Sequence, residues 1–140
     1  MWILYAIGSS VCAALVALFG KIGLKNIDPT LATTVRGILM ALMLVIISIS
    51  FRKFNGFSVG SFSTSDWVYI GLSAFAGALS WLFYFIALKT GPVTIVAAID
   101  RASIILVALG AIVFLGDRLG WQGIGGVLLI GIGMFLLTIK

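Results

Sequence analysis

The sequence contains five apolar runs, each of about 18 to 25 residues, which is the length that an α-helix needs to cross ~30 Å of hydrocarbon. Trp2, Trp67 and Trp121 each stand at the start of a run, where amphipathic rings prefer the membrane interface. The sequence therefore predicts an all-α membrane protein, residues 1–140, with five transmembrane helices in a single domain. The predicted helices cover residues 2–20, 31–51, 67–88, 92–115 and 121–139.

Composition supports a membrane protein, because 62% of the residues are hydrophobic and only 9% are charged, with a mean hydropathy of +1.28. Soluble domains have roughly 45–50% apolar and 25% charged residues. The net charge is +5, but the nine basic residues are scattered along the chain, most of them at the ends of apolar runs, so they form no nucleic-acid-binding patch. Membrane lipids are the expected surroundings. The one cysteine, Cys12, lies within the first run and is expected to pack there.

The residue types needed for most enzyme sites are missing. The sequence has no His and no Glu, and a single Cys, so metal clusters, Cys-His pairs and carboxylate dyads of the usual kind cannot be built. The glycines do not follow a strand or open a phosphate-binding helix, so no dinucleotide fingerprint applies. We expect a protein that is not an enzyme and needs no cofactor.

An adjacent acid and base, Asp100 and Arg101, interrupt the fourth apolar run. A charge near the bilayer centre costs at least ~2.5–3.5 kcal/mol, so such a pair indicates a functional site with a partner elsewhere. In the single helix expected over residues 92–115, Asp100 shares a face with Ser103, whereas Arg101 points about 100° away, so the two charges need not neutralise each other. We expect Asp100 to pair with Arg36 or Lys21 from another helix.

Two further positions are candidates for a binding site. Arg36 lies about two turns into the second run, from which it can either snorkel to the interface or bind a ligand. Trp81 and Tyr84 are three residues apart in the third run and share a helix face, which can line an aqueous cavity or pack against a neighbouring helix. The sequence does not decide between the two roles of Arg36, or between the two roles of Trp81 and Tyr84.

Small residues predict helix contacts in the first and fifth runs. Ser9, Ala13 and Ala17 recur every four residues, which favours close packing. Gly126 and Gly133 are seven residues apart on one face of the fifth run and predict a helix–helix seam.

The connection between the second and third runs, residues 52–66, is rich in Ser, Gly and Phe and lacks helical periodicity. It reads as a surface loop that rests on the bilayer through Phe54, Phe57 and Phe62.

Several segments together carry a family resemblance. They are KIGL at residues 21–24, Arg36, SWLFYFIALKTGP at residues 80–92, IDRAS at residues 99–103 and FLGDRL at residues 114–119. Over nearly its whole length the chain resembles the drug/metabolite transporter superfamily, specifically its single-repeat, five-helix EamA-type members. FLGDRL is the most specific segment, because it resembles the LGE signature with Asp117 in place of Glu. The spacing of a glycine motif that small multidrug resistance relatives use for dimerisation is matched by Gly126, Leu129, Ile130 and Gly133.

The resemblance implies a transporter of metabolites, amino acids or nucleotide sugars, built from a five-helix unit that ten-helix relatives contain twice in inverted orientation. It does not extend to the proton-coupling Glu in the first helix of small multidrug resistance proteins, because residues 12–14 here read Cys-Ala-Ala. Nor does it include the Pro that many ten-helix members place before the LGE signature, where this chain reads Ser103-Ile104.

We therefore expect a transporter of a small amino-acid-like or other organic solute, in the cytoplasmic membrane of a bacterium or archaeon, working by alternating access as a dimer. The candidate substrate-binding residues are Arg36, Trp81, Tyr84, Asp100, Arg101 and Ser103. Two basic groups and one acidic group among them leave a net charge of +1, which favours a carboxylate or phosphate. The alternatives are half of a heterodimer with a paralogous five-helix chain, or a structural or regulatory membrane subunit that does not transport.

Basic residues give almost no instruction on orientation. Five spans place the termini on opposite sides, and the side of the N-terminus carries three basic residues, Arg52, Lys53 and Arg118. The other side carries four, Lys21, Lys25, Lys89 and Lys140. Because Lys/Arg asymmetry sets orientation, the chain is predicted to insert both ways and to form an antiparallel homodimer, and the alternative is a weak preference for a cytoplasmic C-terminus.

Overall fold

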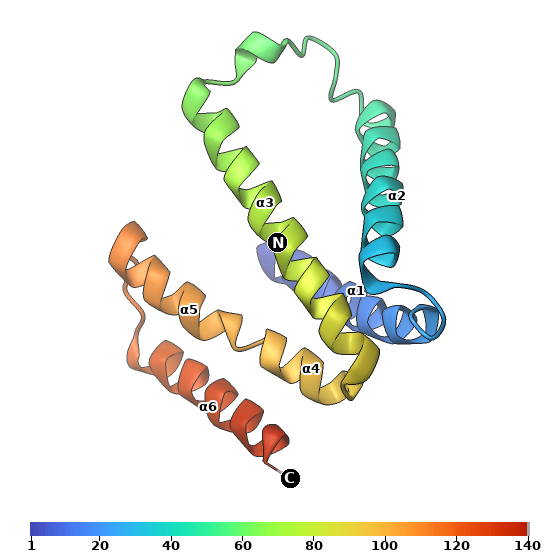
Figure 1. Cartoon of the computed structure of the whole chain (residues 1–140). Coiled ribbons are helices and arrows are strands. Elements are labelled where there is room, and N and C mark those ends of the chain that lie inside the picture. The colour runs from blue at the N-terminus through green and yellow to red at the C-terminus, as the bar shows by residue number, and fades with distance from the viewer. Residues whose placement is uncertain (140) are drawn as a thin grey trace. The chain divides into compact units, whose positions relative to one another are not determined.

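The computed structural model describes residues 1–139, and every regular element among them is helical (Figure 1). Lys140, which the charge count includes, lies outside the described residues. The elements are α1 (Trp2–Gly23), α2 (Pro29–Ser50), the short 3₁₀ helix η1 (Val59–Ser61), α3 (Thr64–Thr90), α4 (Val93–Asp100), α5 (Ser103–Gly110), the π-helical turn η2 (Ala111–Leu115) and α6 (Trp121–Thr138).

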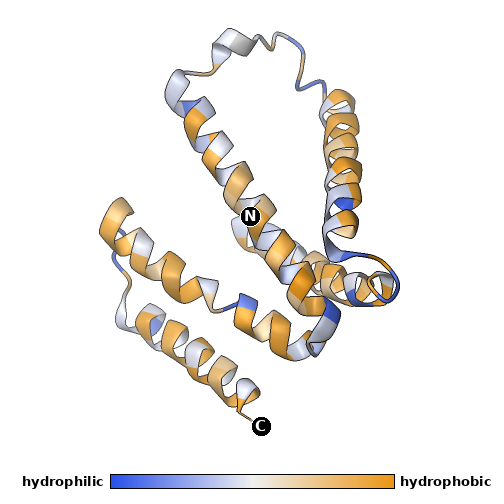
Figure 2. Cartoon of the chain, in the orientation of Figure 1, coloured by the Kyte–Doolittle hydropathy of each residue, from blue (hydrophilic) through white to orange (hydrophobic). Residues whose placement is uncertain are grey.

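Five helical stretches within the described residues are long and apolar enough to cross a membrane, which confirms the predicted fold class. α1, α2, α3 and α6 each form one stretch, and α4, α5 and η2 together form the fourth, Val93–Leu115. Apolar colour runs along these helices and polar colour gathers in the connections (Figure 2). Large apolar side chains are mostly exposed, as expected for surfaces that contact lipid chains, and Leu24, Phe85 and Leu88 are among the few that are buried.

Side-chain caps fix where α2 and α3 begin. Asp28 accepts hydrogen bonds from the backbone N–H of Thr30 (2.9 Å) and Leu31 (3.1 Å), and Pro29 occupies the first turn of α2. These bonds, that from Leu31 above all, lower the pKa of Asp28. A capping box precedes α3, because the Ser63 N–H donates to Asp66 Oδ2 (2.9 Å) and the Asp66 N–H donates to Ser63 Oγ (3.2 Å). The third span therefore begins three residues before the expected Trp67.

The chain divides into two compact units, which are described separately. The first comprises Met1–Lys21 and the chain from Thr90 onward, and in it α6 packs against α4 and α5. The second is Ile22–Lys89, and it contains α2, η1 and α3. In the second unit Lys89 Nζ, near the end of α3, donates to the carbonyl oxygen of Ile27 just before α2 (3.1 Å).

The fourth span is not the single regular helix that was expected over residues 92–115. α4 ends at Asp100, α5 begins at Ser103, and the N–H groups of Arg101 (3.1 Å) and Ala102 (2.9 Å) bond to carbonyls three residues back. The same spacing recurs at Ile104 (3.1 Å) and Ile105 (3.0 Å). These tighter turns interrupt the regular four-residue spacing, although the Arg101 N–H also bonds to the carbonyl of Ala97 four residues back (3.3 Å), and Val93–Leu115 remains a single span.

The FLGDRL segment ends the fourth span. η2 is followed by Gly116, whose φ of +70° is left-handed, and the Asp117 N–H bonds back to the carbonyl of Ala111 (3.1 Å). Glycine suits this position because a side chain would strain a left-handed backbone. The glycine of the LGE-like signature thus terminates the helix, and Asp117 lies in the following loop.

Candidate functional site

Arg36 of α2 lies against the aromatic face of α3 in the second unit. Its guanidinium carbon is 4.2 Å from the centroid of the Trp81 ring and 5.1 Å from that of Phe85. At these distances the positive charge interacts with the electron-rich ring faces, an interaction worth about 0.5–2 kcal/mol depending on desolvation. The structure therefore brings together two of the predicted site residues, Arg36 and Trp81.

One donor of Arg36 is unused. Within the described part of the chain its Nη1 is shielded from solvent and has no hydrogen-bond partner. A guanidinium carries five N–H donors and no acceptor, so only an acceptor group can satisfy Nη1. Leaving a buried donor without a partner costs about 1–3 kcal/mol, and more when it is charged. Arg36 is thus a cation held on aromatic rings with a donor available to an acceptor.

Sequence reasoning missed Phe85. It lies four residues after Trp81, so both rings lie on one face of α3. Phe85 is buried, whereas Trp81 is exposed. The predicted partner of Trp81 was Tyr84, whose ring contacts Phe85 at 6.1 Å between centroids. The four-residue spacing of Trp81 and Phe85 is the signal that identifies this face.

Asp100, Arg101 and Ser103 lie at the break between α4 and α5 in the first unit. Asp100 is half-buried at the end of α4, while Arg101 and Ser103 are exposed. A hydrophilic band marks this break between apolar helices (Figure 2). The N–H groups of Arg101 and Ala102 stay hydrogen-bonded at this break, so the polar groups that it presents are the side chains of Asp100, Arg101 and Ser103. A binding role for these side chains stays a prediction.

The predicted site residues divide between the two units, with Arg36, Trp81 and Tyr84 in the second and the residues of the α4–α5 break in the first. A shared cavity for the two groups stays a prediction. Lys21, one of the expected partners of Asp100, donates a hydrogen bond from Nζ to the carbonyl oxygen of Gly91 (2.9 Å).

The predicted dimer seam lies on an open face of α6. A Cβ atom added at Gly126 or Gly133 would meet nothing within 4 Å, and Leu129 and Ile130 are exposed on the same face. Gly131 differs, because a Cβ atom there would lie 3.2 Å from Ile105 Cδ1 of α5. α6 thus uses Gly131 for packing within the chain, and the face with Gly126 and Gly133 is available to another molecule.

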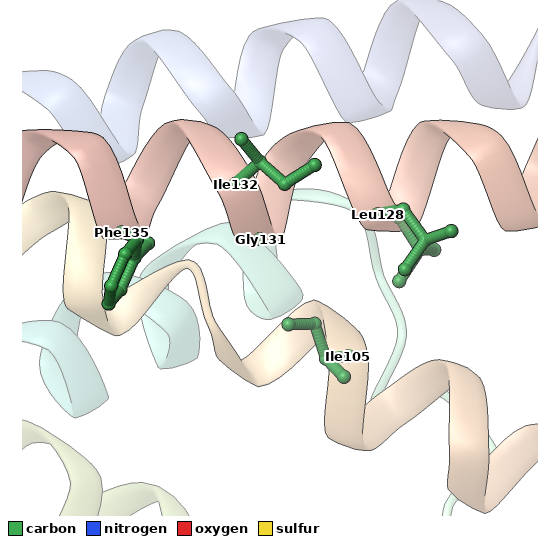
Figure 3. Close-up of a pocket in the computed structure, with 6 residues that line it drawn as sticks. Ile105, Leu128, Gly131, Ile132 and Phe135 are labelled. Atoms are coloured by element: carbon green, nitrogen blue, oxygen red, sulfur yellow. The ribbon is translucent and has the colours of Figure 1, made fainter.

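A hollow of about 270 Å³ lies between α5 and α6 (Figure 3). Its lining residues are all apolar, and they are Ile105, Val127, Leu128, Gly131, Ile132 and Phe135. Burying a charged group against such a surface is costly because no side chain here offers a hydrogen bond. The hollow suits an apolar chain and not the charged end of a metabolite.

Comparison with known families matches residues 1–139 to the EamA-like transporter family. A protein from Sinorhizobium sp, named "Uncharacterized transporter in cobO 3'region", is 33% identical over 138 residues, which span 99% of this chain and 96% of that protein. No solved structure matches significantly. The family match covers all the elements described above.

Proposed function

The chain belongs to the EamA-like transporter family, and on this premise we propose that it carries a small organic solute with a carboxylate or phosphate group across the membrane, by alternating access as a dimer. The chain is a multi-pass membrane protein of a transporter family, which is not a class of enzymes. Amino-acid-like solutes are included, and the proposed location is the cytoplasmic membrane of a bacterium or archaeon.

The observation that carries the anionic preference is the unused Nη1 of Arg36 beside Trp81. A guanidinium pairs with carboxylates and phosphates through two parallel hydrogen bonds, and it remains charged at any physiological pH. Trp81 and Phe85 hold the guanidinium through their rings, and Nη1 is left for the solute. In this proposal Arg36 binds the anionic group, and the ring of Tyr84 contributes to the same wall.

Residue counting supports a second contribution from the α4–α5 break. Arg36 lies seven residues after Pro29, the first residue of α2, and Asp100 lies seven residues after Val93, the first residue of α4. In the proposal, alternate spans begin at the same membrane face, and a rise of 1.5 Å per residue puts each of the two residues about 10 Å along its own helix from that face. We include Asp100, Arg101 and Ser103 in the proposed pathway on this ground.

We propose a dimer because a single chain supplies only one five-helix unit. Transporters of this general kind commonly place their site between two inverted repeats, and this chain supplies five helices. In the proposal, a second copy in the opposite orientation supplies the other repeat, with Gly126, Leu129, Ile130 and Gly133 at the seam. The open α6 face supports this assignment.

Transport by the chain alone is the first expected result. The purified protein, reconstituted in liposomes, should take up at least one solute from a panel of radiolabelled carboxylates, amino acids and phosphate esters, with saturation and above the level of empty liposomes. Absence of uptake across the panel would indicate instead a non-transporting subunit or half of a heterodimer.

The two charges at the break should act in opposite directions on an anionic solute. Arg101→Gln removes a positive charge and should lower uptake by about tenfold, which corresponds to ~1.4 kcal/mol of interaction with the solute. Asp100→Asn removes a negative charge and should lower KM. Arg118→Gln, which makes the same change of charge in the loop after η2, serves as the control. Normal insertion with wild-type kinetics in both break variants would remove them from the pathway.

Orientation provides a separate expected result. With three basic residues against four on the two sides, C-terminal reporter fusions should be active both with a cytoplasmic reporter and with an external one. Activity of the cytoplasmic reporter alone, in the protein expressed by itself, would exclude the antiparallel homodimer and leave a parallel dimer or a paralogue of opposite orientation.

A further inference from the structure

The connection between α2 and α3 folds around a row of aromatic rings. The ring of Phe57 contacts that of Phe54 at 6.0 Å and that of Phe62 at 5.7 Å, and Phe62 in turn contacts Trp67 in the first turn of α3 at 5.4 Å. All three contacts are edge-on, with angles of 80°, 61° and 62° between the ring planes. Such T-shaped pairs are favourable, so the loop has a defined structure although it lacks helical periodicity.

The end of α2 turns the chain into this row. Arg52 has a left-handed backbone with a φ of +52°, and the Lys53 N–H donates to the carbonyl of Ser48 (2.9 Å), which is a Schellman-type helix end. Gly56, with a φ of +78°, makes a second left-handed turn between Phe54 and Phe57. The two basic side chains are therefore placed immediately before the aromatic row.

The row is too exposed to be a small core of its own. Its four rings are between 39% and 48% exposed, although each contacts its neighbour. Their free surfaces form an apolar strip, and an apolar strip of this kind marks a surface that is covered in the working protein.

The position and charge of the loop identify what covers it. The loop joins two membrane-spanning helices, so it lies where the bilayer surface is, and aromatic rings favour the interfacial region. The loop, residues 52–66, contains two basic residues and one acidic residue, Asp66, whose carboxylate accepts hydrogen bonds from Ser63, and its net charge is +1. We propose that Phe54, Phe57, Phe62 and Trp67 insert into the headgroup region of the bilayer and that Arg52 and Lys53 contact anionic lipid phosphates.

A single introduced fluorophore tests the insertion. Phe57→Trp is made in a chain in which Trp2, Trp67, Trp81 and Trp121 are replaced by Phe, and the protein is reconstituted in phosphatidylcholine vesicles that contain phosphatidylglycerol. Nitroxide lipids labelled at a shallow acyl position should quench the indole about twofold more than lipids labelled deep in the chain, and aqueous acrylamide should quench it weakly. Strong quenching by acrylamide, or no quenching by either agent because a protein surface covers the strip, would overturn the proposal.

The role of the two basic residues is tested in the same vesicles. Omitting phosphatidylglycerol should reduce the shallow quenching by about twofold, and Arg52→Gln with Lys53→Gln should remove this dependence on anionic lipid. Lys21→Gln with Lys25→Gln, which makes the same change of charge at the other membrane face, is the matched control. If quenching in the protein that keeps Arg52 and Lys53 does not depend on phosphatidylglycerol, the proposed contact of these residues with anionic lipid phosphates is wrong.

Discussion

Replacing Arg36 by glutamine is expected to reduce uptake of the anionic solute by about 10- to 150-fold in reconstituted protein. The estimate is the loss of a hydrogen bond between charged groups, about 1.5–3 kcal/mol, with each 1.4 kcal/mol equal to about tenfold. Lysine at this position keeps the charge but loses the planar fork and the stacking on Trp81, so Arg36→Lys should be intermediate. The measurement is the initial rate of uptake over a range of solute concentrations, which separates KM from the maximal rate.

A purely structural role of Arg36 predicts a different effect of the substitution on uptake. If the residue only braces α2 against α3, its loss should lower the yield of folded protein and the uptake of every solute alike, whatever its charge. The proposal requires a change in selectivity, in which neutral analogues lose less than anionic ones. Trp81→Leu should reduce uptake of the anion in the same way as Arg36→Gln, because the Trp81 ring holds the guanidinium. Phe83→Leu, at an exposed position of the same helix, is the control and should leave uptake unchanged. Uptake of the anion at the wild-type rate by normally inserted Arg36→Gln would refute the assignment.

Leucine at both Gly126 and Gly133 is expected to separate the dimer and to leave the chain folded. Each Cβ position is open within the chain, so the added side chains clash only with a molecule that approaches this face of α6. Overpacking costs about 1–3 kcal/mol per site, and two sites at the lower bound weaken association by about 30-fold. Cross-linking and co-purification of two differently tagged copies measure the loss.

Gly131→Leu is the matched control for the seam. Its Cβ atom would lie 3.2 Å from Ile105 Cδ1, so the larger side chain disturbs the packing of α6 on α5 within one chain. This variant should lower the thermal stability of the monomer, whereas the double variant should lower association and leave monomer stability nearly unchanged. Unaltered cross-linking of the double variant would show that the dimer forms through another surface.

Local chemistry in the sequence was enough to predict the five spans. Lipid offers no hydrogen bonds to the backbone, so an apolar run of sufficient length must satisfy its own groups by forming a helix, whatever its neighbours are. The cap at Asp28 likewise fixes the start of α2 from residues next to it. The capping box of Ser63 and Asp66 is equally local, and a closer reading of those two residues predicts the observed start of α3.

Only the tertiary structure decided which helix faces meet. Several glycines recur along α6, but their spacing does not tell which of them face the same chain. The structure shows that Gly131 faces Ile105 of α5, whereas a Cβ atom at Gly126 or Gly133 would meet nothing within 4 Å. The contact of Arg36 with Trp81 and Phe85 joins residues more than forty positions apart, so no local pattern contains it. The break at Arg101 and Ala102 includes neither Gly nor Pro, and only its hydrogen bonds reveal it. In lipid, a long apolar run is enough to determine that a segment crosses the membrane as a helix. Because such a helix is largely apolar on every face, only its side-chain contacts determine which helix packs against it.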